Sequence, residues 1–105
     1  MNTTFTIPSS HPSLAGHFPG NPVVPGVVIL DEVMNILKSA KPGLRVTHIA
    51  MVKFLQPLLP GQQVMVELNE KSDTSISFIC LYGETKLVTG QLTLKAWNES
   101  GMNQV

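Results

Sequence analysis

A histidine and an aspartate in the first third of the chain are the residues best placed for chemistry. His17 lies in a loop rich in proline and glycine, and Asp31 follows it among valine, isoleucine and leucine. An imidazole is well suited to take a proton near neutral pH, and neighbouring prolines lower the entropy cost of holding it in place. Apolar neighbours should desolvate Asp31 and favour its protonated form. The two side chains could therefore act as a base and an acid on one substrate.

The segment around these residues predicts a rigid loop that leads directly into a buried helix. Residues 8–26 contain five prolines, which exclude both a helix and a central strand there. Residues 27–40 then predict a helix, with Pro25 suited to its first turn and Pro42 ending it. Its apolar side chains cover most of the circumference, which is typical of a buried helix. The start of such a helix offers N–H groups that can stabilise a carbonyl oxygen as it gains negative charge.

The remaining sequence indicates a sheet that would bury this helix. Short alternating apolar segments separated by turns predict strands at 5–7, 45–54, 62–69, 75–82 and 86–97. We therefore expect residues 1–105 to form a single α+β domain with an antiparallel sheet. The polar tail, residues 98–105, is expected to be frayed.

Composition narrows the classes of partner. Seven basic residues balance seven acidic ones, which argues against nucleic acid. The apolar richness suggests that some hydrophobic surface is buried between subunits. The longest apolar run, residues 23–30, is interrupted and far too short to span a bilayer, so we expect no membrane contact. The chain starts without a basic segment and an apolar stretch, so we expect no signal peptide and a cytoplasmic location.

The other titratable side chains have ordinary interpretations. His11 is interpreted as solvent-exposed, His48 as a surface or interface residue, and Cys80 as a small buried hydrophobic residue. The three histidines lack the spacing of metal ligands and no cysteine pairs with them, so no metal site is predicted.

Residues 17–27, His-Phe-Pro-Gly-Asn-Pro-Val-Val-Pro-Gly-Val, followed by an acid four positions later, resemble the signature of the FabZ/FabA-type 3-hydroxyacyl-[acyl-carrier-protein] dehydratases. Residues 53–62, Lys-Phe-Leu-Gln-Pro-Leu-Leu-Pro-Gly-Gln, are similar to a second stretch of that family, a strand that leads into a Pro-Gly turn. Residues 88–92 fit its last strand. The resemblance extends from about residue 10 to residue 95.

The resemblance implies a hotdog fold, in which an antiparallel sheet wraps around one long central helix. It implies homodimers in which two sheets join and the active sites are shared, with the histidine of one subunit facing the acid of the other. Some family members assemble further, as a hexamer built from three dimers. The implied reaction is dehydration of a 3-hydroxyacyl thioester, bound to acyl carrier protein, to a trans-2-enoyl thioester. It needs neither a cofactor nor a metal.

The same resemblance assigns roles to individual residues. His17 corresponds to the catalytic histidine and Asp31 to the catalytic acid. The backbone N–H of Gly26 would polarise the thioester carbonyl, and the carbonyl of Val23 would orient the histidine. Side chains expected to meet in the acyl tunnel are Phe18, Met51, Leu55 and Phe78. Lys38, Lys41 and Arg45 cluster near the end of the helix. They could stabilise its C-terminal dipole or dock an acidic acyl carrier protein.

Departures from the pattern leave alternatives open. Glu32 follows the acid where the family often has alanine; it points about 100° away from Asp31 around the helix and need not share the site. FabA-type members carry aspartate at the position of Asp31 and FabZ-type members carry glutamate, whereas the size of this chain is that of a FabZ-type member. Residues 30–33, Leu-Asp-Glu-Val, look more like the small dehydratases of aryl-polyene-type pigment clusters. A hotdog acyl thioesterase and a non-catalytic acyl-binding partner subunit remain alternatives. The acyl chain length, and the choice between carrier protein and coenzyme A, also stay open.

Overall fold

A computed structural model of the chain describes residues 2–11 and 23–96. These residues form an α+β fold with one helix and a five-stranded antiparallel sheet in the order β1-β3-β4-β5-β2. The elements are β1 (Asn2–Thr6), α1 (Gly26–Ala40), β2 (Leu44–Phe54), β3 (Gln63–Ser72), β4 (Ser75–Tyr82) and β5 (Thr85–Ala96). The predicted order of helix and strands is confirmed. β1 begins earlier than predicted and β3 ends later, because both gain residues by pairing with neighbouring strands.

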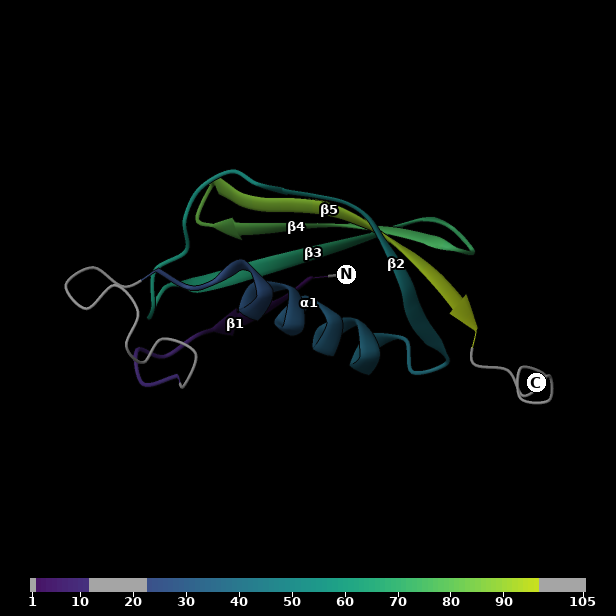
Figure 1. The fold of residues 1–105 in the computed structure, drawn as a ribbon, viewed down its shortest axis with the longest axis horizontal. Coiled ribbons are helices and arrows are strands. Elements are labelled where there is room, and N and C mark those ends of the chain that lie inside the picture. Colours follow the sequence, from purple (N-terminus) through teal and green to yellow (C-terminus); the bar gives the residue numbers. More distant parts are fainter. Residues whose placement is uncertain (1, 12–22, 97–105) are drawn as a thin grey trace.

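Helix α1 begins where proline fixes the backbone. Pro25 is extended, with φ −61° and ψ 144°, and its carbonyl accepts hydrogen bonds from the N–H groups of Val28 and Ile29 at 3.0 and 3.4 Å. The helix ends at Ala40, and the N–H of Lys41 donates to the carbonyl of Leu37 at 2.8 Å. Helix α1 runs along one face of the sheet (Figure 1).

Within one chain, α1 is buried on one side only. Its buried side chains are Val28, Ile29, Val33 and Leu37. Val27 is 65% exposed and Asp31 is also exposed. Because apolar residues occur nearly all round this helix, the sequence predicted burial on every side. A single copy of the sheet buries only one side of it. α1 is 15 residues long and lies against the sheet.

The core lies between α1 and the inner face of the sheet. Alternate residues of β3, β4 and β5 are buried there, as the alternating sequence predicts. They are Val64, Val66, Leu68, Ile76, Phe78, Cys80, Val88, Leu92 and Leu94. Burial raises the pKa of the Cys80 thiol to about 12, so it stays protonated and unreactive at neutral pH. The interpretation of Cys80 as a buried hydrophobic residue is confirmed.

Among the residues that the structure describes, strand β2 forms one edge of the sheet and pairs only with β5. Its register shifts twice, between Val46 and His48 and again between Ile49 and Met51. Such irregularities add local bend and twist to an edge strand. The exposed large hydrophobic residues of this strand are Ile49, Met51 and Phe54. Among residues 2–11 and 23–96, no helix is long and apolar enough to cross a membrane.

Candidate active site

The beginning of α1 and the segment that follows β2 together form a pocket of about 350 Å³. Two sets of backbone hydrogen bonds hold this segment. The N–H of Val24 donates to the carbonyl of Leu58 at 2.8 Å, and the N–H groups of Leu55 and Gln56 donate to that of Leu87 at 2.8 and 3.2 Å. The lining residues are Val23, Val24, Gly26, Ile29, Phe54, Leu55, Gln56, Pro57 and Leu58. A mostly apolar pocket at a helix N-terminus suits a ligand with an apolar body and one polarised oxygen.

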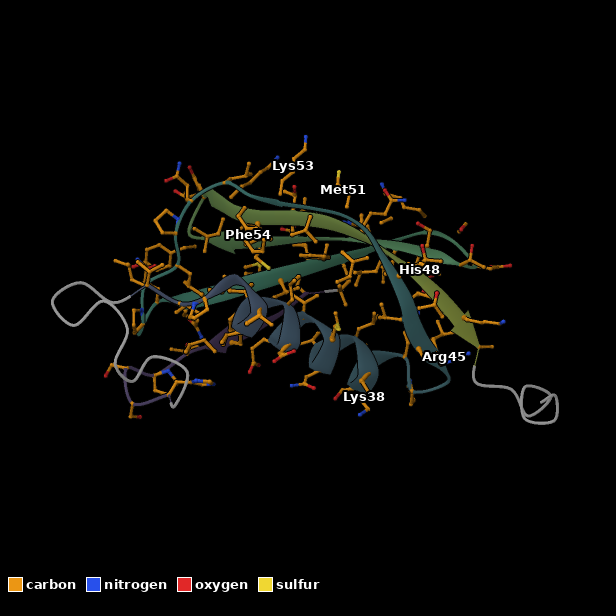
Figure 2. All side chains as sticks on the ribbon, viewed as in Figure 1. Lys38, Arg45, His48, Met51, Lys53 and Phe54 are labelled. Carbon is orange, nitrogen blue, oxygen red and sulfur yellow. The ribbon has the colours of Figure 1, made fainter. Side chains whose placement is uncertain are left out.

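Gly26, the first residue of α1, lies directly beneath an aromatic ring. A Cβ atom at this position would stand 2.7 Å from Cζ of Phe54 and 2.8 Å from its Cε1. Glycine is therefore the residue that lets the ring approach the helix backbone so closely. The Phe54 ring is 53% exposed, so it covers the first turn of α1 without being locked in the core (Figure 2). The N-cap residue, Pro25, makes no side-chain hydrogen bond to this turn.

Asp31 lies on the opposite side of α1 from the core. It is two residues from the buried Val33, which places the two side chains about 160° apart around the helix axis. It is also about 7.5 Å further along the axis than Gly26. Val27, Asp31, Met34 and Lys38 follow one another at helical spacing and share this outward face. The enclosure expected from the apolar neighbours of Asp31 is absent in a single chain, because those neighbours point in other directions.

The structure brings some predicted site residues together and separates others. Val23, Gly26 and Leu55 share the pocket. Met51 is exposed on β2, and Phe78 is fully buried in the core, so neither lines this pocket in one chain. His17 and Phe18 lie outside the described residues.

The three predicted docking cations differ in their surroundings. Lys38 is in the last turn of α1, Arg45 is exposed on β2, and Lys41 forms an ion pair with Glu70. The two other histidines have local contacts. The N–H of His11 donates to the carbonyl of Pro8 at 3.0 Å, and Nδ1 of His48 lies 3.2 Å from Oγ1 of Thr47.

Phe54 was not predicted as a site residue. It belongs to the second motif, residues 53–62, whereas Gly26 belongs to the first. The signal that could have revealed it is the presence of both stretches in one chain, since two separated motifs often meet at one site. The contact itself depends on where β2 ends relative to α1.

A sheet of this strand order with one helix on its face agrees with the hotdog class of folds. A family model described as ApeI-like, ApeI dehydratase, matches residues 1–91. The chain belongs to this ApeI-like dehydratase family.

Individual relatives agree with this assignment. A 3-hydroxyacyl-[acyl-carrier-protein] dehydratase FabZ from Ehrlichia canis is 32% identical over 92 residues, 75% of this chain and 60% of that protein. The chain thus spans about 60% of the length of this curated relative. The solved dehydratase heterocomplex ApeI:P from Xenorhabdus doucetiae is similar with TM-score 0.78 and 27% identity, over 89% of this chain and 84% of that one. A 1,4-dihydroxy-2-naphthoyl-CoA thioesterase from Synechocystis has TM-score 0.63 and 16% identity over 93% and 83% of the two chains, which shows a shared fold alone.

Proposed function

We propose that this protein dehydrates 3-hydroxyacyl thioesters, presented by acyl carrier protein in the cytoplasm, to trans-2-enoyl thioesters. The observation that carries the proposal is the match to a dehydratase family over residues 1–91. This span includes both motif stretches, and the pocket at the start of α1 is built from residues of each.

The proposed reaction is an elimination of water. His17 takes the proton from the carbon next to the thioester carbonyl, and the electron pair moves toward the carbonyl oxygen. The N–H of Gly26 stabilises that oxygen as its negative charge grows. The carbonyl of Val23 holds the imidazole in position. Asp31 then donates a proton to the β-hydroxyl group, which leaves as water while the carbon–carbon double bond forms.

We propose further that the active form is a homodimer. Asp31 is exposed on the outward face of α1, and the edge strand β2 carries exposed hydrophobic residues. A second copy paired along β2 would join the two sheets and cover these faces. The joined sheets would then surround the helices, and His17 of one subunit would meet Asp31 of the other.

The dimer can be tested with two methionines of nearly equal exposure. Met51 on β2 is 42% exposed and Met65 on β3 is 40% exposed. Lysine at position 51 would bury an unpaired charge at the proposed interface, so Met51→Lys should weaken dimerisation at least ~10-fold. Met65→Lys adds the same charge away from β2 and should leave the dimer intact. Analytical ultracentrifugation measures both. Equal association of the two variants would contradict pairing along β2, and a larger assembly, such as a hexamer, would be visible in the same data.

The pocket itself yields a second test. Gly26→Ala would push the Phe54 ring from the first turn of α1. Because this ring is half exposed, it can move aside, and we expect little loss of thermal stability. The displaced ring would alter the pocket, and a misplacement of about 1 Å can lower turnover by up to ~10²-fold. A smaller side chain in Phe54→Leu should recover part of that loss in the double variant. Unchanged turnover of Gly26→Ala would argue against this pocket as the thioester site.

The reaction is tested directly by following enoyl formation in the ultraviolet with 3-hydroxyacyl groups of several lengths on carrier protein and on coenzyme A. We expect absorbance of the conjugated enoyl thioester to appear without release of free thiol. Release of thiol without an enoyl product would contradict the proposal and support a thioesterase. Binding of the substrate with no turnover would instead support an acyl-binding subunit.

A further inference from the structure

The chain makes a tight turn at residues 59–62, between the pocket and β3. Gly61 has φ 86°, and the N–H of Gln62 donates to the carbonyl of Leu59 at 3.3 Å. Proline at the second position, here Pro60, and glycine with positive φ at the third are typical of a type II β-turn. The Pro-Gly pair of the second motif therefore sets the shape of this turn.

The side chain of Gln62 closes the same turn from the other direction. Its Oε1 atom accepts a hydrogen bond from the N–H of Leu59 at 3.0 Å. Gln62 thus bonds to both polar backbone groups of Leu59, to the carbonyl through its own backbone and to the N–H through its side chain. The conformation of residues 59–62 therefore depends on the oxygen at the end of this side chain.

Two further backbone hydrogen bonds join the turn to both flanks of the segment that carries His17. The N–H of Gly61 donates to the carbonyl of Ile7 at 2.8 Å. The carbonyl of Leu58, just before the turn, accepts from the N–H of Val24 at 2.8 Å. Because Ile7, Leu58 and Val24 are all buried, little water competes for these bonds. Figure 1 shows this connection, from β2 to β3, beside the chain that enters α1.

Val24 lies between the two backbone groups to which the proposed reaction gives a role. The carbonyl of Val23, which orients the imidazole, precedes it, and the N–H of Gly26, which stabilises the thioester oxygen, follows it. Pro25 joins Val24 to Gly26 and has its φ fixed by its ring, here at −61°. A shift of Leu58 would therefore be passed through Val24 to both groups.

We infer that Gln62 is a positioning residue for the proposed reaction. Its side chain fixes the turn, the turn places the carbonyl of Leu58, and that carbonyl holds Val24 at the start of α1. Gln62 is not among the residues that line the pocket, so it acts through these bonds and not on the substrate. The inference rests on the proposed function, since the groups that it positions are those of the proposed elimination.

Two substitutions of equal length separate the hydrogen bond from the packing of this side chain. Gln62→Met keeps the length but replaces the amide oxygen with a weakly accepting sulfur, whereas Gln62→Glu keeps an oxygen acceptor. For Gln62→Met we expect kcat to fall ~10-fold or more with little change in KM, because a misplacement of about 1 Å can cost up to ~10²-fold in turnover. Gln62→Glu should remain close to wild type. Steady-state kinetics of enoyl formation measure both constants.

Gln63→Met is the matched control, because it makes the same substitution at the next residue, which is exposed at the start of β3. It should keep the wild-type kcat and KM. An unchanged kcat in Gln62→Met would overturn the inference, as would an equal loss in Gln63→Met or a loss that Gln62→Glu fails to avoid.

Hydrogen exchange of the Val24 amide, followed by NMR, tests the same bonds without relying on activity. The exchange rate should rise roughly 10-fold in Gln62→Met, because a weakened turn lets the Val24 N–H open to solvent. It should stay at the wild-type value in Gln62→Glu and Gln63→Met. If the wild-type protein formed no enoyl product, the proposed reaction would fail by itself, and this rate would then decide the inference. Faster exchange in Gln62→Met alone supports it, and equal rates in all variants overturn it.

Discussion

Asp31→Asn and His17→Ala are each expected to lower turnover of a 3-hydroxyacyl thioester by ~10²-fold or more, the usual contribution of a general acid or base. Asparagine has nearly the same shape as aspartate but holds no proton that it can give to the leaving hydroxyl. Because Asp31 lies on the outward face of α1, away from the core of its own chain, the substitution should leave the chain folded. Enoyl formation under substrate saturation and thermal unfolding of the same samples measure the two effects.

Glu32→Gln is the matched control for Asp31→Asn. It removes the same charge from the next residue of α1, which points about 100° away. We expect turnover close to wild type. If Glu32→Gln lost activity while Asp31→Asn kept it, the role of the acid would move to Glu32. Wild-type turnover in both Asp31→Asn and His17→Ala would contradict the roles proposed for the acid and the base.

Gly90→Ala is expected to destabilise the fold by roughly 1–3 kcal/mol or more, as overpacking of a core does. A Cβ atom at position 90 would stand 2.4 Å from Cε2 of Phe78 and 2.9 Å from the backbone oxygen of Met51. Neither neighbour can retreat easily. Phe78 is 0% exposed, and Met51 belongs to β2, which pairs with β5 at this point. Urea denaturation at constant protein concentration measures the change.

Two further variants show whether this contact causes the loss. Gly43→Ala places a Cβ where nothing lies within 4 Å, so it should be neutral or stabilise by up to ~1 kcal/mol. Phe78→Leu removes the ring that the new Cβ would meet, so Gly90→Ala should cost less stability in the double variant than alone. The two changes would then not be additive. A Gly90→Ala protein as stable as Gly43→Ala would contradict the packing described for β4 and β5.

Much of the fold could be predicted because burial on one face gives a strand a simple period. In β3 the buried Val64, Val66 and Leu68 alternate with Gln63, Met65 and Glu67, and this period of two predicts the strand. Proline at 25 and at 42 likewise set the limits of α1. The extent of β1 could not be predicted in this way, because its residues are largely polar threonines and it is held by pairing with β3. The register shifts in β2 leave no signal in the apolar pattern.

The candidate site was predictable only where it depends on local sequence. Gly26 at the start of a helix follows from the preceding prolines. The ring of Phe54 above it joins residues far apart in the chain, and no local pattern predicts such a contact. The surroundings of Asp31 were predicted from its sequence neighbours, although Leu30 and Val33 project from other sides of α1. Enclosure of this carboxyl group requires a surface beyond its own chain.

The two irregularities in β2 also limit how copies of this protein can polymerise. A long, straight, apolar edge is a template to which strands can be added without end, as in a fibril. Here the longest stretch of β2 with unbroken register is Met51–Phe54. A bent edge of this kind is a poorer template for such addition, because its backbone groups do not lie in one straight row. The opposite edge, β1, has only five residues and offers a short template. Straightening β2 would therefore be expected to increase aggregation before it affected the fold.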